Sequence, residues 1–512
     1  FNQNYMPNDE KVSMTDVVRS YQFLTPGTIP DPDAKPGLVG FMKPLLDGAF
    51  VPDMSPGNEK RFVEERVLKV QAKEIIPSDT QVKYMHEFAE LLIPEPHRLM
   101  PYSDDVVYER QKRPSQRAIL EQAQNGSPNR VTTQFLKKEA YSTVNDPRGI
   151  SQINGVDKLA YSAFIYAFVD MILSKQPWYA FGKSPKEIAA IVNAICMDAV
   201  SHVDMTDFSR MDGRIGFIAR ILEEIVMKRA FAPEWFFRMN ELMRRQYMLM
   251  AVIGFERYMT KFQRLSGSAE TAAFNTLLTA FVNYATFRYM GYSPREAWEA
   301  LGLYGGDDGI TADLKYAIAI RTAKGVGQKL DLERVERGGF GINFLARRYG
   351  PGVWFKDGLD SCCDIVRQLS KFHVTVNLPA HVTAAQKLQE KAFAFSLTDS
   401  NTPILGDFVK RVLAIYPLKK DEFTNALGIW GVATEDGTQY PNSNVGDWMD
   451  DYVNSVLPEF DYAGFREWLA GTDAGTIFCP PRFTPALPPD SKPGKVAVDG
   501  DLIIVNPKKE RG

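Results

Sequence analysis

The chain has 512 residues and a formal net charge of −3, so any contact with a polyanion must use a local basic surface rather than the charge of the whole molecule. Hydrophobic residues make up 45% of the sequence and aromatic residues 12%, which excludes a disordered chain and favours about two to four domains. Four cysteines without a CxxC pair and five scattered histidines exclude the usual zinc spacings, and no apolar run approaches the roughly 20 residues of a membrane-spanning helix.

The N-terminal half combines loops, helices and a basic stretch. The first 60 residues are rich in Pro, Gly, Asn and Asp, which predicts loops that lie over another part of the fold. From 98 to 148 the basic residues occur in loops and in a predicted strand at 131–136, without the spacing of a solvated helix face. Apolar periodicity predicts helices over 62–73, 80–92, 159–173, 186–197, 215–227 and 233–250, and alternation predicts a strand over 258–265.

The C-terminal half is mostly helical. A long apolar helix ends near Met290 and is followed by a predicted helix over 294–301, a hairpin at 303–311, a helix over 314–324 and a strand near 329–335. Beyond Phe478 prolines dominate, and we expect an irregular tail, a candidate initiation platform or exit-channel plug. Helical patterns between these regions cover 359–372, 382–396, 406–416, 420–430 and 446–456.

Acidic residues follow two of the predicted strands. The hairpin at 303–311 sets Asp307 and Asp308 beside two glycines at its tip, and Asp207 ends a short apolar run earlier in the chain. Carboxylate and phosphate oxygens are the ligands that Mg²⁺ prefers. Three carboxylates from two strand ends can hold two metal ions about 4 Å apart, an arrangement that clamps the attacking and leaving oxygens in phosphoryl transfer.

The order of these segments resembles that of the motifs in RNA-dependent RNA polymerases of positive-strand RNA viruses. The resemblance covers about residues 140–350, and the sequences at 266–271 and 303–309 are most similar to the polymerase region of nodavirus replicases. The matching positions are 207–212 for motif A, Ser266, Gly267, Thr271 and Asn275 for motif B, 306–308 for motif C, Lys137, Lys138, Glu139 and Arg148 for motif F, and 344–348 for motif E.

This resemblance implies an α+β right-hand polymerase fold. It would have fingers, a palm built on an antiparallel sheet, a helical thumb, and closed fingertips formed by N-terminal loops. The expected boundaries are 1–97 for the N-terminal extension and fingertip region, 98–195 and 215–262 for the fingers, 196–214 (motif A) and 263–343 (motifs B, C and D) for the palm, 344–475 for the thumb with motif E at its start, and 476–512 for the Pro-rich tail.

The resemblance also implies roles for individual residues. Asp207 and Asp307 would bind two Mg²⁺ or Mn²⁺ ions, with Asp308 as a weaker ligand, and these three are the expected catalytic residues. Gly267 would permit a close backbone approach or an unusual φ. The ribose 2′-OH would be read by a carboxylate, two hydroxyls and an amide, all of which can hydrogen-bond a hydroxyl: Asp212, Ser266, Thr271 and Asn275.

Basic residues before and after the palm would contact phosphates. Motif F would neutralise the nucleotide phosphates through Lys137, Lys138 and Arg148. Arg347 or Arg348 of motif E would hold the backbone of the nascent strand.

Four further residues lie near the motifs, and three of them have more than one interpretation. Lys324 and Lys329 both lie where the motif D lysine could protonate the leaving pyrophosphate, and either is equally explained as a solvated helix end. Asp204 is expected to cap or solvate its strand, with an outer metal ligand as the alternative. Asp313 is expected at the start of a helix.

The expected function is template-directed RNA synthesis from NTPs, replicating a viral positive-strand RNA genome. Two alternatives are a reverse transcriptase of the same palm architecture and a non-catalytic RNA-binding replication scaffold. Asn275 with the pair Asp212 and Thr271 suits ribonucleotides rather than deoxyribonucleotides. A scaffold has no need for clustered negative charge beside bound RNA, and the intact carboxylates argue against it.

The expected partners are RNA template, nascent RNA and NTPs. A chain that begins at Phe1 is expected to be a piece of a longer protein, and the family has an upstream capping and membrane-anchoring region. The resemblance therefore implies a membrane-associated viral replication complex in the host cytoplasm, at intracellular membranes that include the mitochondrial outer membrane. The piece itself is expected to be soluble, and a homo-oligomer is a candidate state.

Overall fold

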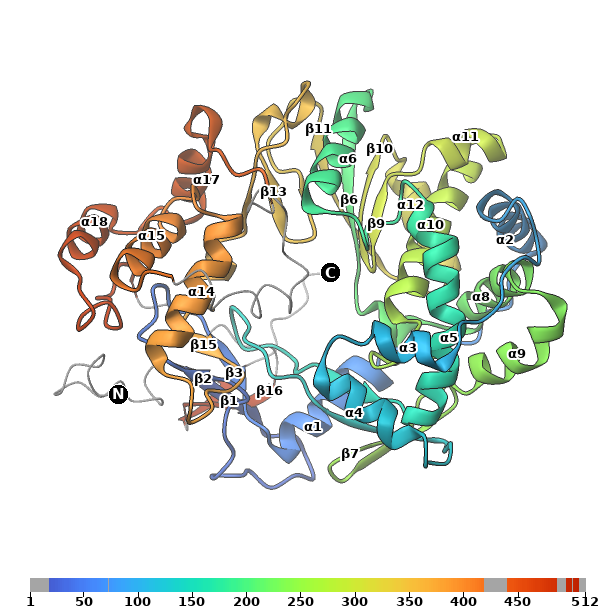
Figure 1. The fold of residues 1–512 in the computed structure, drawn as a ribbon, viewed down its shortest axis with the longest axis horizontal. Coiled ribbons are helices and arrows are strands. Elements are labelled where there is room, and N and C mark those ends of the chain that lie inside the picture. The colour runs from blue at the N-terminus through green and yellow to red at the C-terminus, as the bar shows by residue number, and fades with distance from the viewer. Residues whose placement is uncertain (1–17, 72, 419–439, 486–493, 500, 506–512) are drawn as a thin grey trace.

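An antiparallel sheet of four strands lies at the centre of the fold (Figure 1). The computed structural model describes residues 18–71, 73–418, 440–485, 494–499 and 501–505. The strand order of this central sheet is β11-β6-β10-β9. Its register sets Asp331 opposite Asp207 and Gly309 opposite Thr206. The strands are β6 (His202–Phe208), β9 (Leu303–Gly305), β10 (Asp308–Ala312) and β11 (Leu330–Glu336).

Helices cover both faces of the central sheet. Because side chains alternate along a strand, Val203 and Met205 pack toward α6 (Pro185–Asp198), whereas Phe208 packs in the core on the other face. On that other face lies α10 (Thr271–Tyr289), whose residues 273–287 are all buried, the polar ones among them included. Helices that contribute to the same core are α2 (Asp79–Leu92), α5 (Gly155–Met171), α8 (Phe217–Ala230), α9 (Phe236–Arg244), α11 (Pro294–Glu299) and α12 (Tyr316–Gly325).

A second four-stranded sheet carries the basic stretch. Its strand order is β5-β4-β7-β8, with β4 parallel to β7 and antiparallel to β5. The strands are β4 (Val131–Leu136), β5 (Gly149–Gln152), β7 (Met250–Ile253) and β8 (Glu256–Met259). Short helices nearby are α3 (Asp104–Arg110), α4 (Pro114–Ala123) and α7 (Met211–Arg214), with 3₁₀ turns at Leu173–Lys175 and Pro233–Trp235.

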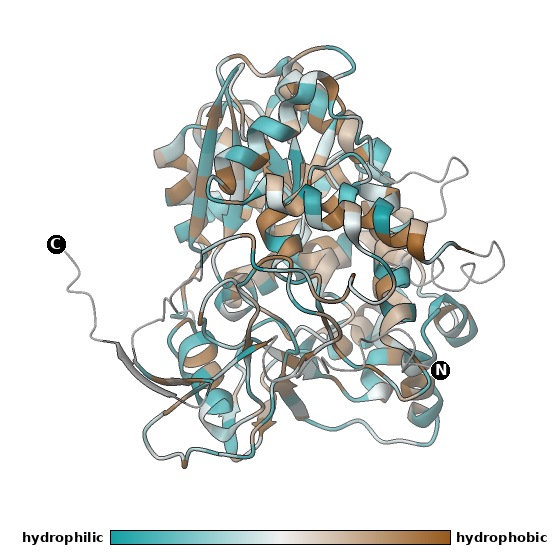
Figure 2. Cartoon of the chain, turned by 90° about the vertical axis from the view of Figure 1, so that its left-hand side faces the viewer, coloured by the Kyte–Doolittle hydropathy of each residue, from teal (hydrophilic) through white to brown (hydrophobic). Residues whose placement is uncertain are grey.

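The C-terminal part forms a helical body with its own core. In Figure 2, hydrophobic and hydrophilic residues alternate along individual helices, the pattern of helices that bury one face. The helices are α14 (Ala384–Thr398), α15 (Leu405–Ile415), α17 (Trp448–Val456) and α18 (Tyr462–Gly471), with a 3₁₀ turn at Val445–Asp447. They follow β12 (Asn343–Phe344), β13 (Arg347–Tyr349), a 3₁₀ turn at Pro351–Trp354, β14 (Ser361–Cys363), α13 (Ile365–Leu369) and β15 (Val374–Thr375).

The N-terminal segment links the two sides of the molecule. Strand β2 (Val39–Gly40) pairs with β15, and Phe41 and Leu45 pack among the C-terminal helices. A sheet of order β17-β16-β1-β3 joins the first and the last strands of the described residues. The remaining elements are β1 (Arg19–Phe23), β3 (Phe50–Pro52), α1 (Pro56–Phe62), a π-helix at Val63–Leu68, β16 (Gly494–Val498) and β17 (Asp501–Val505).

Several sequence predictions differ from the structure. The predicted helix over 233–250 ends at Arg244, and its last residue begins β7. The predicted strand over 258–265 is wrong beyond Met259, because β8 closes a hairpin and the chain then turns. The helix over 359–372 begins instead with strand β14, and the tail contains the hairpin β16–β17. The helix predicted over 420–430 lies outside the described residues.

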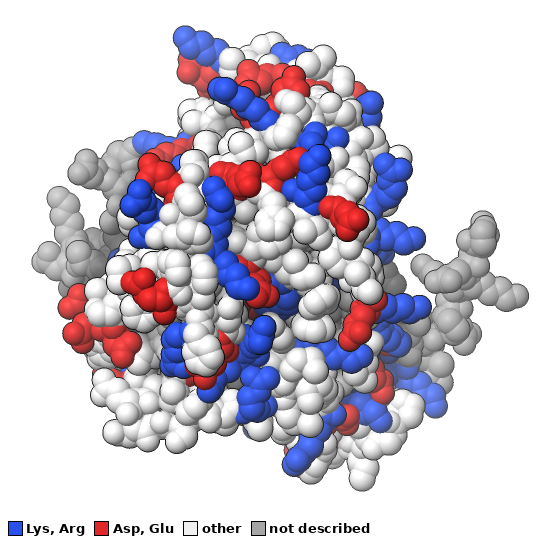
Figure 3. Space-filling model, turned by 90° about the vertical axis from the view of Figure 1, so that its right-hand side faces the viewer, with Lys and Arg blue, Asp and Glu red and all other residues white. Residues whose placement is uncertain are grey.

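Charged residues are mixed over the face shown in Figure 3, where Lys and Arg are interspersed with Asp and Glu. This agrees with the small net charge of the sequence. Among the described helices, none is both long and apolar enough to cross a membrane.

Candidate active site

Three aspartates come together where β6 ends and the β9–β10 hairpin turns. Ligand oxygens of Asp207, Asp307 and Asp308 all lie within 4.8 Å of one another. The turn requires a φ of +68° at Gly306, a conformation that favours glycine. Asp207 and Asp307 are exposed to solvent, and Asp308 is half-buried. Three carboxylates at this spacing fit Mg²⁺ or Mn²⁺, which bind hard oxygen ligands.

Two threonines of α10 hold the turn that carries Asp307. The backbone N–H of Gly306 donates to Thr276 Oγ1 at 2.8 Å, and Thr279 Oγ1 donates to the Gly306 carbonyl at 2.7 Å. Sequence reasoning missed both residues, although hydroxyls three positions apart in an otherwise apolar helix are a usable signal. The rigid, buried helix therefore fixes the position of the hairpin tip.

Replacing Thr276 or Thr279 with valine keeps the shape of the side chain and leaves a Gly306 backbone group without its partner. We expect each change to cost about 1–3 kcal/mol of stability and to lower kcat for nucleotide incorporation, because the turn loses an anchor. Denaturant unfolding and single-nucleotide incorporation measure the two effects. Thr286→Val is the control: this buried hydroxyl donates only within its own helix, to Val282, so kcat should be retained. Equal losses of kcat in all three variants would contradict the anchoring role.

The electrostatics of the aspartate cluster favour a bound cation. Burial, followed by the charges of Asp307 and Asp207, raises the pKa of Asp308 to about 7. Burial also raises the pKa of Asp207, with further contributions from Asp307 and from Asp331 on the adjacent strand. Carboxylates that resist ionisation for these reasons gain most from a divalent ion, which neutralises their mutual repulsion.

The Mg²⁺ affinity of this site should rise with pH. The folded chain holds the Asp308 proton up to about pH 7, whereas an unfolded aspartate loses it near 3.8. Because the folded state binds more protons in that window, this group lowers folding stability as pH rises from about 4 to about 7. A cation must displace the same proton, so titrating the melting temperature with Mg²⁺ should give tighter binding at about pH 8 than at about pH 6. Asp308→Asn should flatten this dependence, and a wild-type affinity independent of pH would contradict the assignment.

Asp212 and Asn275 meet beside the aspartate cluster. Asn275 Nδ2 donates to Asp212 Oδ1 at 2.7 Å, and its own Oδ1 accepts from Arg264 Nε at 3.0 Å. Since a guanidinium can only donate, this contact fixes the orientation of the amide and turns its N–H groups toward Asp212. Burial raises the pKa of Asp212, whereas the Asn275 bond and the Arg264 charge lower it. Arg264 was not predicted from the sequence.

Arg264 belongs to a buried cluster of two arginines and two glutamates. Its guanidinium donates to Glu270 at 2.7 Å and also to Glu223. Arg220 donates to the same two carboxylates at 2.6 and 3.1 Å. The four charges cancel and every member is paired, which is the condition under which buried charges are tolerated. The cluster forms a rigid support behind Asn275.

The other predicted motif B residues lie in the same region, where their contacts involve backbone groups as well as side chains. Ser266 Oγ accepts from the Ser151 N–H at 3.0 Å, and a Cβ on Gly267 would collide with the Ser151 carbonyl, so the close approach predicted for this glycine is observed. Thr271 Oγ1 donates to the Leu265 carbonyl at 2.8 Å.

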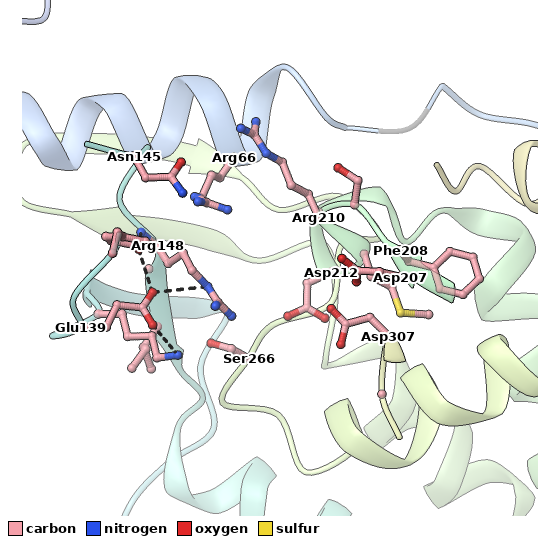
Figure 4. A pocket seen from close by; sticks show the side chains of 18 of the residues that line it. Arg66, Glu139, Asn145, Arg148, Asp207, Phe208, Arg210, Asp212, Ser266 and Asp307 are labelled. Atoms are coloured by element: carbon pink, nitrogen blue, oxygen red, sulfur yellow. Dashed lines mark hydrogen bonds and ion pairs between the residues drawn. The ribbon is translucent and has the colours of Figure 1, made fainter. Parts of the chain in front are cut away.

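A cavity of about 1270 Å³ connects these carboxylates to basic residues (Figure 4). Lys137 and Arg148 line it, as predicted, and both contact Glu139, with separations of 3.0 and 3.6 Å. Lys138 does not line it: this side chain is exposed and packs beside Gly37. Asp308 borders a second cavity of about 380 Å³. Lining cations that the sequence did not indicate are Arg66, Arg210, Arg367 and Lys371.

The two motif E arginines are placed differently from each other. Arg347 is buried and forms an ion pair with Asp399 at 2.8 Å and hydrogen bonds with Ser361, so its guanidinium is committed to protein partners. Arg348 is half-buried, over the ring of Tyr452 at 5.9 Å. Neither residue lines the large cavity. The position of Arg347 corrects its expected contact with the nascent strand, because side chains on a strand alternate and this one points into the core.

Other candidate residues take structural positions. Asp204 is fully buried and pairs with Arg334 at 2.8 Å, so it is neither a solvated strand end nor a metal ligand. Asp313 precedes the helix in a left-handed conformation, and its carboxylate accepts backbone N–H groups of Val200 and Ser201. Lys324 and Lys329 do not line the large cavity, and the choice between them for motif D stays open.

The chain is similar to curated viral proteins. It is 30% identical over 477 residues to the RNA-directed RNA polymerase of Striped jack nervous necrosis virus, covering 90% of this chain and 47% of that protein. It is 31% identical over 419 residues to that of Pariacoto virus, covering 78% and 40%. The chain thus spans about half or less of the length of these relatives. No protein-family model matches it.

The structure is similar to a solved polymerase. The crystal structure of the RNA-dependent RNA polymerase of a human picorbirnavirus matches with a TM-score of 0.57 and 12% identity, over 81% of this chain and 85% of that chain. This likeness confirms the predicted fold class, an α+β fold of the viral polymerase type. The chain therefore has the right-hand fold of viral RNA-dependent RNA polymerases, and its relatives over most of its length are the RNA-directed RNA polymerases of nodaviruses.

Proposed function

We propose that this chain synthesises RNA on an RNA template by nucleotidyl transfer from NTPs. One observation carries the proposal: two of the three aspartates that can hold divalent ions, Asp207 and Asp307, line one large cavity together with a group of cations. A nucleoside triphosphate has a polyanionic end and a reacting α-phosphate, and such a cavity can bind both parts at once. The similarity to RNA-directed RNA polymerases supports the same conclusion.

The residues of the cavity would divide the work of the reaction. Two bound metal ions would supply charge neutralisation at the attacking and leaving oxygens. Asp207 and Asp307 would hold both ions, with Asp308 as a weaker ligand. Lys137 and Arg148 would give up part of their ion pairing with Glu139 and bind the phosphates of the incoming nucleotide.

Asp212 would accept a hydrogen bond from the ribose 2′-OH, since Asn275 occupies only one of its two carboxylate oxygens. The sugar of the incoming nucleotide would then lie between the aspartate cluster and α10. This arrangement favours ribonucleotides and disfavours a reverse transcriptase.

The setting of the reaction belongs to the same proposal. The partners are template RNA, nascent RNA and NTPs, and the product is a copy of a positive-strand viral genome. The relatives are about twice as long as this chain or longer, and we propose that the remaining part places the polymerase in a replication complex on host intracellular membranes. For the fingers, palm and thumb, we propose the same boundaries that were predicted from the sequence.

A templated incorporation assay tests this function. The chain is incubated with a short RNA template, Mg²⁺ or Mn²⁺, and labelled NTPs, and one NTP at a time is left out. Products that stop where the template requires the missing nucleotide would support RNA-templated synthesis. A preference for dNTPs would favour a reverse transcriptase. RNA binding without metal-dependent incorporation on any template would favour the replication scaffold.

A further inference from the structure

An arginine from the N-terminal segment enters the nucleotide cavity. Arg66 lies in the π-helix at Val63–Leu68 and lines the cavity that contains Asp207 and Asp307. Figure 4 shows Arg66 and Arg148 on one side of this cavity, with the carboxylates of Asp207, Asp212 and Asp307 across from them. Short π-helical segments occur frequently at functional sites, because the extra residue redirects side chains.

Arg66 differs from its neighbouring cations in its partners. Lys137 and Arg148 contact Glu139, and Arg210 bonds the Asp146 carboxylate at 2.9 Å and the Glu65 carbonyl. Arg66 forms one hydrogen bond, from Nε to the Asp146 carbonyl at 2.8 Å. Among the described residues no carboxylate forms an ion pair with Arg66, so its two terminal NH₂ groups retain their donors.

The surroundings of Arg66 make its unneutralised charge costly. Burial lowers the pKa of its guanidinium, and the charges of Arg210 and Arg148 lower it further, against opposing effects of Tyr141 and of the Asp146 carboxylate. Arginine nevertheless stays protonated in proteins. An anion that contacts all three arginines would neutralise their charges together. The phosphate groups of a triphosphate each offer two oxygens that a guanidinium can bind in bidentate fashion.

Packing fixes Arg66 relative to the rest of the site. A Cβ on Gly213, the residue after Asp212, would lie 2.8 Å from the Arg66 carbonyl, so the π-helix rests directly on the end of motif A. The ring of Phe62 occupies the space that a side chain on Gly149 would need, next to Arg148. The backbone at Arg66 is therefore held against both the ribose side and the phosphate side of the cavity.

We propose that Arg66 binds the terminal phosphates of the incoming nucleoside triphosphate, which makes the N-terminal π-helix part of the substrate site. The inference rests on the proposed function and extends it to a segment that motif reasoning left as fingertip structure. Of the three cations assigned to phosphate from the sequence, Lys138 lies outside the cavity, and Arg66 supplies the third together with Lys137 and Arg148.

The test compares Arg66→Gln with Lys69→Gln in the full chain. Lys69 follows the same π-helix, is exposed and does not line the cavity, so its loss removes the same charge outside the site. For Arg66→Gln the KM for ATP should rise about 10- to 100-fold with kcat nearly unchanged, because a charge-assisted bond to phosphate is lost. The inhibition constant of inorganic tripolyphosphate should rise by a similar factor. Arg66→Lys should restore part of both losses, and Lys69→Gln should match wild type.

A binding measurement separates this inference from the proposed reaction. Tripolyphosphate with Mg²⁺ should raise the melting temperature of the wild-type chain and of Lys69→Gln, and less so that of Arg66→Gln, whether or not the chain polymerises RNA. Equal tripolyphosphate effects in wild type and Arg66→Gln would overturn the proposal. So would a lower kcat and melting temperature at unchanged KM, since Arg66 would then act only through its bond to Asp146.

Discussion

Replacing Asp307 with asparagine is expected to reduce NTP incorporation by about 10³-fold or more, in Mg²⁺ and in Mn²⁺. The substitution keeps the size of the side chain and removes one of the charges that hold the metal ions, whose electrostatic stabilisation amounts to several kcal/mol. Because Asp307 lies at the exposed tip of a turn, the fold should survive the change. Single-nucleotide incorporation on a primed RNA template measures the loss.

Asp105→Asn is the matched control for this substitution. Asp105 is an exposed aspartate in the first turn of α3 and does not line the large cavity. It should retain wild-type incorporation, and both variants should unfold close to the wild-type temperature. Incorporation by Asp307→Asn at the wild-type rate under saturating metal would remove this cluster from the reaction and with it the proposed two-metal mechanism.

Replacing Asn275 with leucine should weaken discrimination between NTPs and dNTPs by about 10- to 100-fold. The leucine keeps the branched shape of the side chain, with a somewhat larger volume, and removes both the donor to Asp212 and the acceptor for Arg264. Hydrogen bonds to charged groups contribute about 1.5–3 kcal/mol, and the loss falls on the substrate that carries the 2′-OH. The ratio of kcat/KM for ATP to that for dATP should therefore fall mainly through the value for ATP.

Asn283→Leu provides the control because it makes the same change eight residues later in α10. Asn283 is also buried, and its side chain accepts from Thr311 and donates to the Thr279 carbonyl, away from Asp212. This variant should lose stability and keep the ATP to dATP ratio. If both variants change the ratio equally, the effect comes from α10 as a whole and not from the ribose contact.

Local sequence pattern was sufficient to predict the functional residues whose positions depend on a short segment of the chain. Two aspartates at the tip of a glycine-containing hairpin can only emerge at the end of a sheet, and a third at the end of another strand meets them once those strands pair. The family resemblance of the motifs implied that Asp212 and Asn275 lie in one region, and they do. These residues lie in short, strongly patterned segments, for which periodicity and turn chemistry are informative.

Side-chain direction on short elements was not determined by pattern. Arg347 and Arg348 are adjacent and chemically identical, yet one is buried against Asp399 and the other is half-buried beside Tyr452. A step of one residue along a strand reverses the side on which a side chain lies, so the choice depends on the register with β14. Lys137 and Lys138, which directly follow β4, are likewise adjacent, and only Lys137 lines the large cavity.

The sequence by itself determined the fold class, the order of the motifs and the three aspartates: the first two through the resemblance to a known family, and the aspartates because each stands in a short, strongly patterned segment. The tertiary structure decided which distant groups support them. Arg66 reaches the cavity from an N-terminal helix, Thr276 and Thr279 anchor the hairpin from another element, and Arg264 pairs with two glutamates behind Asn275. Strand β1 and the turn after β16, far apart in the sequence, are joined in the same way, with Arg19 bonded to Asp499 at 2.9 Å. Contacts of this kind depend on how separate elements pack. A buried polar residue needs a hydrogen-bonding partner, but the sequence around it does not show which distant group that partner is.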